Sequence, residues 1–322
     1  MKKSTGIFMT LISGLFILSI CSCNHKKIND PHWTTFTTDN GLVCNKVYSI
    51  TIDRKGVKWF GTDQGVSRFD DTSWTTYTTK NGLAYNTINA IISDRSGNIW
   101  CCSDGGGVSK FDGTHWTTYT TKNGLASDRI YAAAVDSAGN LWFGTDHCGV
   151  SVFDGDKFLT YTADNGLSSN DVFAICIDAA GNKWFGTYDG MLTRYDGVKW
   201  LVCYSPTCGP APNSALAIAI DALGNKWIAT WSGVLKYDDN NWIRYTFKDG
   251  LVHNSVKSIA IDARGNKWFA TLNGVSEFND VRWITYNTDN GLAGNEVYNV
   301  IIDRFGNKWF ATDKGVSELN EN

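Results

Sequence analysis

The chain has 322 residues, including 14 Trp, 13 Tyr and 16 Phe, and its charged residues (19%) leave a net charge of −3. This balance excludes a disordered chain and a strongly basic nucleic-acid-binding surface. Only four of the 32 acidic residues are Glu, so Asp dominates. Because Asp favours turns and caps over helix interiors, the composition predicts an all-β chain with many turns.

The N-terminal segment is predicted to be an export signal. Lys2 and Lys3 precede an apolar run over residues 6–20. As a helix, this run would span about 22 Å, short of the roughly 30 Å hydrocarbon core of a bilayer. A cleavable signal peptide therefore fits better than a membrane span.

The end of this run reads Ile-Cys-Ser-Cys, which resembles the lipobox of bacterial lipoproteins with Cys23 as the lipidated residue. We expect a lipoprotein signal peptide at residues 1–22 and a short linker at residues 23–32. The mature chain is then expected in the cell envelope, as an outer-membrane lipoprotein facing the periplasm or the cell surface, attached to the membrane by its lipid alone. A plain secretory signal with incidental cysteines is the alternative.

The remainder of the chain is a sevenfold repeat. The phrase G-x-x-W recurs every 41 to 43 residues, and an Asp lies three residues before each Gly. This pattern favours a tight β-hairpin, because Gly accepts a positive φ and Asp bonds nearby backbone N–H groups. The seven copies run over residues 53–59, 94–100, 136–142, 178–184, 221–227, 262–268 and 303–309.

Each repeat is predicted to contain four short strands, called a, b, c and d in chain order. In the first repeat they are Val47–Ile52, Val57–Thr62, Val66–Phe69 and Trp74–Thr78. Such a unit cannot bury both of its faces alone, so the copies must stack around an axis as a β-propeller.

The chain ends predict how the ring closes. The last repeat stops at Leu319 after its strand c, whereas residues 33–38 form a strand d that has no blade of its own. Pairing these ends completes the last blade and removes an open sheet edge. The predicted fold is therefore an all-β, seven-bladed propeller of four-stranded antiparallel blades over residues 33–322, closed by the N-terminal strand.

Most of the tryptophans are explained by packing between blades. Seven lie in strands b and six in strands d, whereas Trp231 alone falls in a loop. The innermost strand carries a small or modest residue four positions before each repeat Asp, as expected where strands converge. These residues are Ser49, Ala90, Ala132, Ala174, Ala217, Ser258 and Asn299.

The run over residues 295–316 reads N-E-V-Y-N-V-I-I-D-R-F-G-N-K-W-F-A-T-D-K-G-V. It resembles the two-component regulator propeller repeat, N-x-V-x-x-I-x-x-D-x-x-G-x-x-W-x-G-T, with Ala311 in place of the Gly of G-T. The resemblance implies a periplasmic ligand-binding propeller of the kind found in hybrid sensor kinases, many of which are linked to polysaccharide sensing. No kinase, DNA-binding region or later transmembrane segment is recognisable up to Asn322, so we expect binding rather than signalling by this polypeptide.

A ligand is expected at the face built by the b-to-c and d-to-a loops, since loops on a rigid scaffold carry function. Aromatic residues beside carboxylates and amides suit sugar rings, whose flat faces stack while their hydroxyls need hydrogen-bond partners. We expect Trp231, Tyr188 and Tyr85 to form a stacking platform. The other candidates are Asp63, Asp104, Asp146, His147, Asp189, His253 and Asp313.

Two other interpretations of this face remain open. The loops can be merely variable surface, or they can dock an envelope protein instead of a glycan or another small molecule. An enzyme is the weaker alternative, because no catalytic motif, cofactor motif or metal-ligand spacing is present. Streptogramin lyases share the fold and use His and Glu with a metal ion, but His147 and His253 lack the expected Glu or His partners.

The cysteines suggest one structural feature. Cys203 and Cys208 flank a proline-containing segment that replaces the usual N-G-L, and we expect a disulfide between them in an oxidising compartment. Cys101 and Cys102 replace the Phe-Gly pair of strand b and are predicted to be small buried residues.

Overall fold

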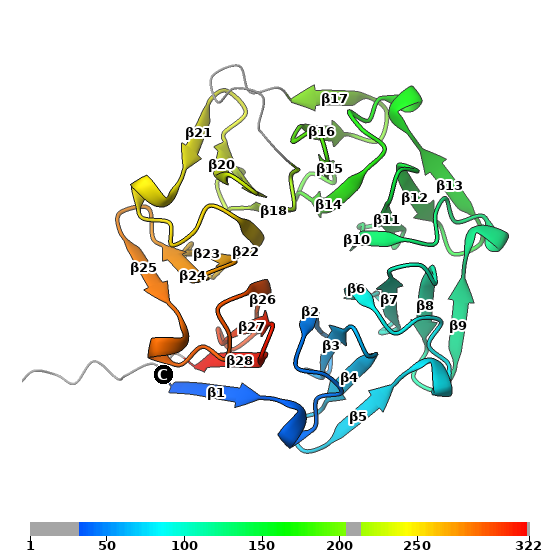
Figure 1. The fold of residues 1–322 in the computed structure, drawn as a ribbon. Helices are drawn as coiled ribbons and strands as arrows, with labels where there is room; N and C mark the ends of the chain where they lie inside the picture. The colour runs from blue at the N-terminus through cyan, green and yellow to red at the C-terminus, as the bar shows by residue number, and fades with distance from the viewer. Residues whose placement is uncertain (1–31, 204–213, 321–322) are drawn as a thin grey trace, which may run out of the picture. The chain divides into compact units, whose positions relative to one another are not determined.

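The computed structural model describes residues 32–203 and 214–320, which lie in one compact unit. These residues form seven four-stranded antiparallel sheets and no α-helix. Figure 1 shows the sheets as blades around an axis, with β2, β6, β10, β14, β18, β22 and β26 innermost. The predicted seven-bladed propeller is confirmed.

The blades share one strand pattern. Blade 1 contains β2 (Val47–Ile52), β3 (Lys58–Thr62), β4 (Val66–Phe69) and β5 (Trp74–Tyr77), and blade 2 contains β6 (Ile88–Ser93), β7 (Ile99–Ser103), β8 (Val108–Phe111) and β9 (Trp116–Tyr119). Blade 3 contains β10 (Ile130–Val135), β11 (Leu141–Thr145), β12 (Val150–Phe153) and β13 (Phe158–Tyr161), and blade 4 contains β14 (Val172–Ile177), β15 (Lys183–Thr187), β16 (Leu192–Tyr195) and β17 (Trp200–Cys203). Blade 5 contains β18 (Ala217–Ile220), β19 (Lys226–Thr230), β20 (Gly233–Tyr237) and β21 (Trp242–Tyr245), and blade 6 contains β22 (Val256–Ile261), β23 (Lys267–Thr271), β24 (Gly274–Phe278) and β25 (Trp283–Tyr286). Blade 7 contains β26 (Val297–Ile302), β27 (Lys308–Thr312), β28 (Gly315–Asn320) and the N-terminal β1 (His32–Phe36).

Ring closure follows the predicted scheme. Strand β1 pairs antiparallel with β28, from His32 opposite Asn320 to Phe36 opposite Val316. The first and last described strands therefore share one sheet, which Figure 1 shows as the blue β1 beside the red β28. This pairing leaves no open joint in the ring.

The hydrophobic core lies between neighbouring blades. Trp59 and Val66 of blade 1, for example, pack with Ile88, Ile91 and Phe111 of blade 2 in one cluster. The same arrangement recurs around the ring, with a strand-b Trp in each of the seven clusters and the strand-d aromatic of one blade packed against the next. The prediction that these aromatic residues serve packing is confirmed.

The repeat Asp accepts more hydrogen bonds than the sequence suggested. As predicted, the Oδ1 of Asp53 accepts from the backbone N–H groups of Lys55 (2.8 Å) and Val57 (3.0 Å), while Gly56 has a φ of 86°. In addition, its Oδ2 accepts from the indole Nε1 of Trp59 at 3.3 Å. The same Asp-to-indole bond occurs in all seven blades, so one carboxylate fixes the turn and satisfies the buried indole.

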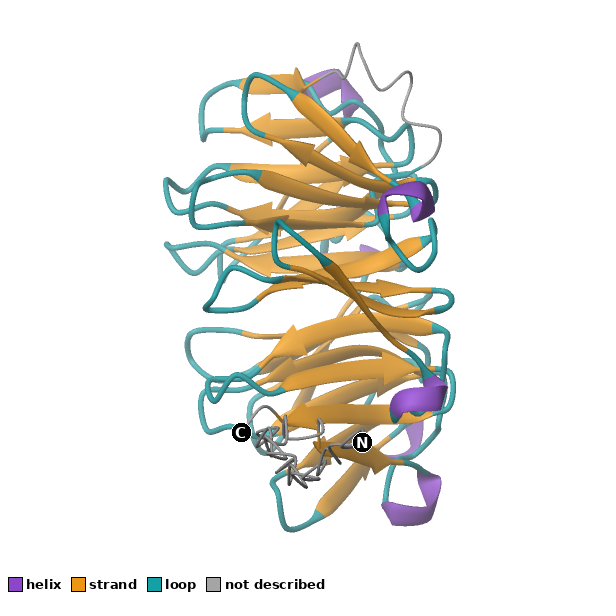
Figure 2. Ribbon diagram, turned by 90° about the vertical axis from the view of Figure 1, so that its left-hand side faces the viewer, coloured by secondary structure: helices purple, strands orange, loops and turns teal. Residues whose placement is uncertain are grey.

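The connections divide the ring into two faces. In a four-stranded meander, the b-to-c and d-to-a connections lie at one end of each blade, which we call the loop face, and the a-to-b and c-to-d turns lie at the other, the turn face. Six d-to-a connections hold a single 3₁₀ turn where the sequence suggested an open loop: η1 (Thr38–Asn40), η2 (Thr79–Asn81), η3 (Thr121–Asn123), η4 (Ala163–Asn165), η5 (Phe247–Asp249) and η6 (Thr288–Asn290). Figure 2 shows these turns gathered toward one side of the ring.

The innermost strands carry a feature that positions the functional site. In blade 1, Val47 pairs with Thr62 and Ser49 pairs with Gly61, so Tyr48 is an extra residue in a β-bulge. Six blades have the same register shift at this point, and blade 5 does not. The small residues predicted on strand a lie opposite a Gly, Ala or Cys of strand b. A Cβ added to Gly61 would lie 2.5 Å from the Ser49 hydroxyl.

Several predictions fall on chain segments that the structure does not describe. The signal peptide and Cys23 lie in residues 1–31, and Cys208 lies in residues 204–213. The lipidation and disulfide predictions therefore remain predictions. Cys101 and Cys102 are fully buried, as expected. In the described chain, no helix has the length and apolar character needed to cross a membrane.

Candidate functional site

The three predicted stacking residues lie on the loop face and expose their rings. Trp231 follows β19 and is 41% exposed, Tyr188 follows β15 and is 63% exposed, and Tyr85 precedes β6 and is 43% exposed. They belong to three different blades, and among the described residues no ring contact joins any two of them. A shared ligand would therefore have to be held by residues between them.

A second group of residues, which the sequence analysis missed, occupies that position. We call it the mouth ring, and it consists of the bulged residues of the six innermost strands that contain a β-bulge. Its members are Tyr48, Asn89, Tyr131, Phe173, Lys257 and Tyr298. A bulge re-aims the side chain of its extra residue, and bulges are common beside active and binding sites.

Ring contacts between neighbouring blades join two pairs of residues in the mouth ring. The ring centroids of Tyr48 and Tyr298 lie 5.4 Å apart, and those of Tyr131 and Phe173 lie 4.9 Å apart. Phe173 in turn lies 6.4 Å from Tyr188. The predicted loop residue Tyr188 is thus continuous with the bulged residues.

Trp231 contacts the mouth ring through a cation. The Nζ of Lys257 lies 3.3 Å from the centroid of the Trp231 ring, within the range of a cation–π interaction. Burial lowers the pKa of Lys257 to about 8, while the negative charge of Glu296 acts in the opposite direction. A partly buried amine beside an exposed indole gives this part of the face both a stacking surface and a hydrogen-bond donor.

The contact between blades 7 and 1 is also polar. The Nζ of Lys46 lies 5.4 Å from the ring centroid of Tyr48 and 5.9 Å from that of Tyr298. The hydroxyl of Tyr298 donates to Glu296 Oε2 at 2.8 Å. Burial, followed by the Glu296 carboxylate, raises the pKa of Tyr298. The predicted residues Asp63 and Asp313 also belong to these two blades, and each has an Oδ1 atom with no protein donor in the described chain.

Arg129 brings two predicted residues together, and His147 joins them through Asp146, whose Oδ1 lies 3.5 Å from His147 Nε2. Arg129 contacts Asp104 through Nε at 2.8 Å and Asp146 through Nη1 at 2.8 Å. His147 has a φ of 59°, and its Nδ1 lies 2.6 Å from Asp171 Oδ1. Neither Arg129 nor Asp171 was singled out from the sequence.

The same cluster offers ligand atoms of Asp146, His147 and Asp171 within 4.8 Å of one another, a spacing that a metal ion could use. However, Asp146 already accepts from Arg129, and Asp171 also accepts from the backbone N–H of His147 at 2.8 Å. A bound cation would have to displace these contacts and lie beside the guanidinium. The residues therefore fit an ion-paired loop network better than a metal centre.

The side chains of the remaining two candidates accept hydrogen bonds from residues of their own loops. Asp189 accepts from the backbone N–H of Met191 at 3.1 Å and from the hydroxyl of Thr187. His253 Nδ1 accepts from the backbone N–H of Ser255 at 3.0 Å. No contact in the described chain joins His253 to His147, so the two histidines considered for a lyase are not brought together.

Three cavities of about 280 to 400 Å³ lie on the turn face, and none of the ten predicted ligand residues lines them. These three hollows lie at the end of the blades opposite the aromatic and polar residues of the loop face.

One known family matches the chain. Residues 124–147 and 166–189 match the family described as "Two component regulator propeller". These stretches run from a d-to-a connection through the bulged strand and the Asp-Gly-Trp hairpin to the b-to-c loop. No curated protein matches the chain.

The fold is also similar to solved propellers. The extracellular domain of a putative hybrid two component system from B. thetaiotaomicron superimposes with a TM-score of 0.79 at 22% identity, over 90% of this chain and 42% of that chain. A streptogramin B lyase gives 0.73 at 18% identity over 91% and 98%. PorZ, a surface component of the type-IX secretion system of Porphyromonas gingivalis, gives 0.72 at 16% identity over 89% and 47%.

At these identities the similarity establishes the fold alone, and this chain spans less than half of the two component system chain. The chain is therefore a seven-bladed propeller in which two stretches, each covering most of one repeat's a-to-b hairpin, match the two-component regulator propeller family.

Proposed function

We propose that this propeller is a non-enzymatic, sensor-like binding module that takes a carbohydrate on its loop face. The observation that carries the proposal is the mouth ring. Six of the seven innermost strands contain a bulge that a regular sheet does not need, and five of the six bulged residues are aromatic or cationic.

The chemistry of this surface suits a sugar. Tyr131, Phe173 and Tyr188 form a linked set of rings on which the apolar faces of pyranose rings can stack. On blades 6 and 7, the amine of Lys257 and the carboxylate of Glu296 supply a donor and an acceptor for hydroxyl groups. A glycan of several residues could contact more than one blade.

The non-enzymatic part of the proposal rests on how the ionisable side chains are used. Asp104 and Asp146 are held by Arg129, and His147 and His253 belong to separate loops. A catalytic centre needs a base or nucleophile placed beside a reacting group, and the predicted residues do not converge in that way. The sequence match to two-component regulator propellers supports a sensor-like role.

The test is a glycan array followed by calorimetric titration of the tightest-binding glycan. Trp231→Ala and Tyr131→Ala each remove one stacking ring, and we expect affinity to fall about five- to thirtyfold, equivalent to about 1 to 2 kcal/mol. Phe247→Ala is the matched control, because Phe247 is an exposed aromatic residue outside the mouth ring, on η5.

Two results would reject the carbohydrate assignment. One is a glycan that binds the Trp231 and Tyr131 variants as tightly as the wild type. The other is an empty array together with specific capture of an envelope protein, lost in both variants, which would favour the protein-docking alternative.

We also propose that the propeller acts outside the cytoplasm, with Cys23 as its lipid anchor. Cys23→Ser should move the protein from the membrane fraction to the soluble envelope fraction and abolish incorporation of labelled fatty acid. A variant that keeps its label and its membrane association would reject this anchor.

A further inference from the structure

The turn face carries three arginines at one repeat position, and they lie on neighbouring blades. Each follows the repeat Asp of its a-to-b turn: Arg304 in blade 7, Arg54 in blade 1 and Arg95 in blade 2. All three are exposed. The other four blades have Ser137, Ala179, Ala222 and Ala263 at this position.

The fold does not require these arginines. In blade 3, where the position is Ser137, Asp136 still accepts from the backbone N–H of Ala138 at 3.0 Å and from the indole of Trp142 at 3.1 Å. Blade 1 makes the equivalent bonds with Arg54 in place. Serine and alanine therefore serve the turn equally well, and the arginines need another explanation.

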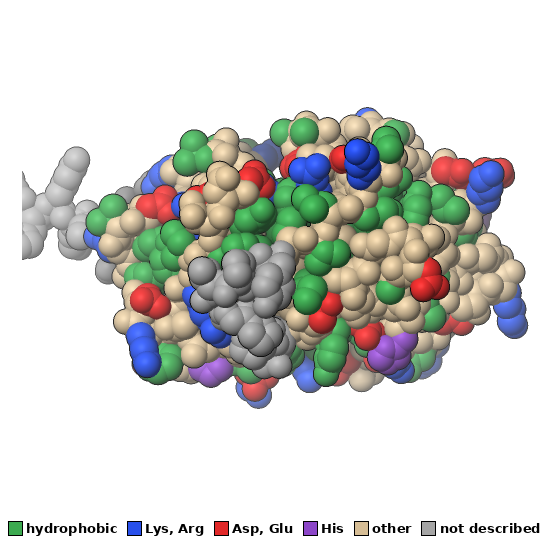
Figure 3. Space-filling view, turned by 90° about the horizontal axis from the view of Figure 1, so that it is seen from above, with side chains coloured by type: hydrophobic (Ala, Val, Ile, Leu, Met, Phe, Trp, Pro, Cys, Tyr) green, Lys and Arg blue, Asp and Glu red, His purple; other side chains and the backbone are tan. Residues whose placement is uncertain are grey.

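Among the described residues, the three cations are not neutralised by direct ion pairs. The nearest acidic residues by position, the repeat Asp residues, direct their oxygens toward their own turn and indole. No carboxylate in the described residues forms an ion pair with Arg54, Arg95 or Arg304. On the side of the ring seen in Figure 3, by contrast, basic and acidic side chains are interspersed.

Three hollows meet at this cluster. A cavity of about 400 Å³ between blades 1 and 2 is lined by Arg54 and Arg95, and a second of about 340 Å³, nearer the axis, is lined by the same pair. A third cavity of about 280 Å³ between blades 7 and 1 is lined by Arg54 and Arg304. Arg54 thus borders all three.

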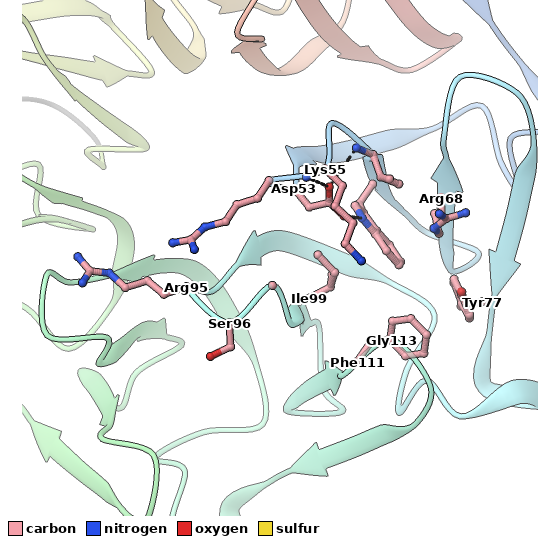
Figure 4. Close-up of a pocket in the computed structure, with 13 residues that line it drawn as sticks. Asp53, Lys55, Arg68, Tyr77, Arg95, Ser96, Ile99, Phe111 and Gly113 are labelled. Carbon is pink, nitrogen blue, oxygen red and sulfur yellow. Dashed lines mark hydrogen bonds between the residues drawn. The ribbon is translucent and has the colours of Figure 1, made fainter.

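The largest cavity combines charge with an apolar lining. Figure 4 shows its lining, in which Tyr77, Ile99 and Phe111 lie away from the guanidinium of Arg95. Trp59 also lines it. Guanidinium groups match phosphate, sulfate and carboxylate oxygens through paired N–H donors, whereas aromatic side chains favour an apolar or ring-shaped group.

We infer that the turn face binds an anionic small molecule whose oxyanion lies between Arg54 and Arg95 and whose ring lies in the adjoining 400 Å³ cavity. This second site lies opposite the loop face and does not depend on the proposed carbohydrate site. Arg304 adds positive charge beside it, which favours ligands with more than one negative group.

Calorimetric titration of the purified protein tests the inference with three probes. Phenyl phosphate carries both a ring and an oxyanion, inorganic phosphate carries the oxyanion alone, and benzyl alcohol carries the ring alone. We expect phenyl phosphate to bind most tightly of the three, and its affinity to fall as the salt concentration rises. Benzenesulfonate and benzoate then show which oxyanion is preferred.

The double variant Arg54→Ala/Arg95→Ala should bind phenyl phosphate about tenfold more weakly, or weaker still. A tenfold loss of affinity corresponds to about 1.4 kcal/mol. The control is Arg282→Ala, which removes an arginine from a c-to-d turn on the same face in blade 6. The double variant should unfold at the same denaturant concentration as the wild type or higher, because it relieves repulsion between cations.

The inference is wrong if phenyl phosphate fails to bind, or if it binds the double variant as tightly as the wild type. Equal affinity for benzyl alcohol and phenyl phosphate would also contradict it, since the cavity alone would then explain binding. If a glycan binds the double variant as tightly as the wild type, the proposed loop-face site is independent of the turn-face site.

Discussion

Replacing Asp136 by alanine tests the interaction that recurs in every blade. The Asp136 side chain accepts hydrogen bonds from the backbone of Ala138 (3.0 Å), from the backbone and side chain of Asn140 (both 2.9 Å) and from the indole of Trp142 (3.1 Å). Asp136 is 5% exposed and Trp142 is 4% exposed. Water therefore cannot replace the lost carboxylate at the indole.

The expected cost follows from these bonds. A buried donor left without a partner costs about 1 to 3 kcal/mol, and hydrogen bonds to a charged group contribute about 1.5 to 3 kcal/mol. Because these contributions overlap, we expect Asp136→Ala to lower the free energy of unfolding by about 3 kcal/mol. Asp154→Ala, in an exposed turn of the same blade, should lower the free energy of unfolding clearly less.

Urea unfolding at neutral pH measures both variants, and a double-mutant cycle isolates the indole. Trp142→Phe removes the indole N–H, which has no acceptor once Asp136 is replaced. The substitution should therefore lower the free energy of unfolding by at least about 1 kcal/mol less in the Asp136→Ala background than in the wild type. Additive effects, or equal losses for Asp136→Ala and Asp154→Ala, would refute the reasoning.

The same interaction has a defined pH dependence. Burial alone would raise the pKa of Asp136, but hydrogen bonds from Asn140 and Trp142 outweigh it and lower the pKa below its usual value. The ionised form thus stabilises the fold above about pH 4, and this contribution is lost as the pH falls further. The difference in free energy of unfolding between the wild type and Asp136→Ala should narrow as the pH falls below about 4.

Two further variants test other parts of the structure. The pKa of Lys257 is lowered to about 8 in the fold. The free energy of unfolding of the wild type, relative to that of Lys257→Met, should therefore rise by up to about 1.4 kcal/mol per pH unit between about pH 8 and pH 10. A difference that does not change with pH would contradict the burial of the amine. Gly291 has a φ of 115°, and an added Cβ would lie 2.3 Å from the Trp33 ring of the closing strand. Gly291→Ala should therefore lower the thermal midpoint more than Gly139→Ala, which has a φ of 95° but open space around it; equal shifts would show that backbone strain alone matters.

The blades could be predicted from the sequence because every repeat carries the same pattern of structural residues. The Asp, Gly and Trp of the hairpin, the small residue on strand a and the unmatched N-terminal strand together determined the number of blades and the closure. The 3₁₀ turns and the Asp-to-indole bond were missed. Their signals, a Thr before x-x-Asn-Gly and a constant six-residue spacing from Asp to Trp, are present in the sequence.

The site was less predictable because its residues are the ones that break the repeat. Trp231 and Tyr188 were found as loop departures, whereas Tyr131 and Lys257 were missed because they lie within predicted strands. A bulge depends on register, which the alternating pattern alone does not reveal. The signal that could have found them is the variable residue directly before each small residue of strand a.

Hydrogen–deuterium exchange with and without the tightest-binding glycan tests the central claim most directly. We predict slowed exchange at the bulged segments and b-to-c loops of the loop face, including residues 130–131, 172–173 and 231. Protection confined to the turn-face hairpins, or no change despite saturating ligand, would contradict the assignment of the mouth ring as the binding surface.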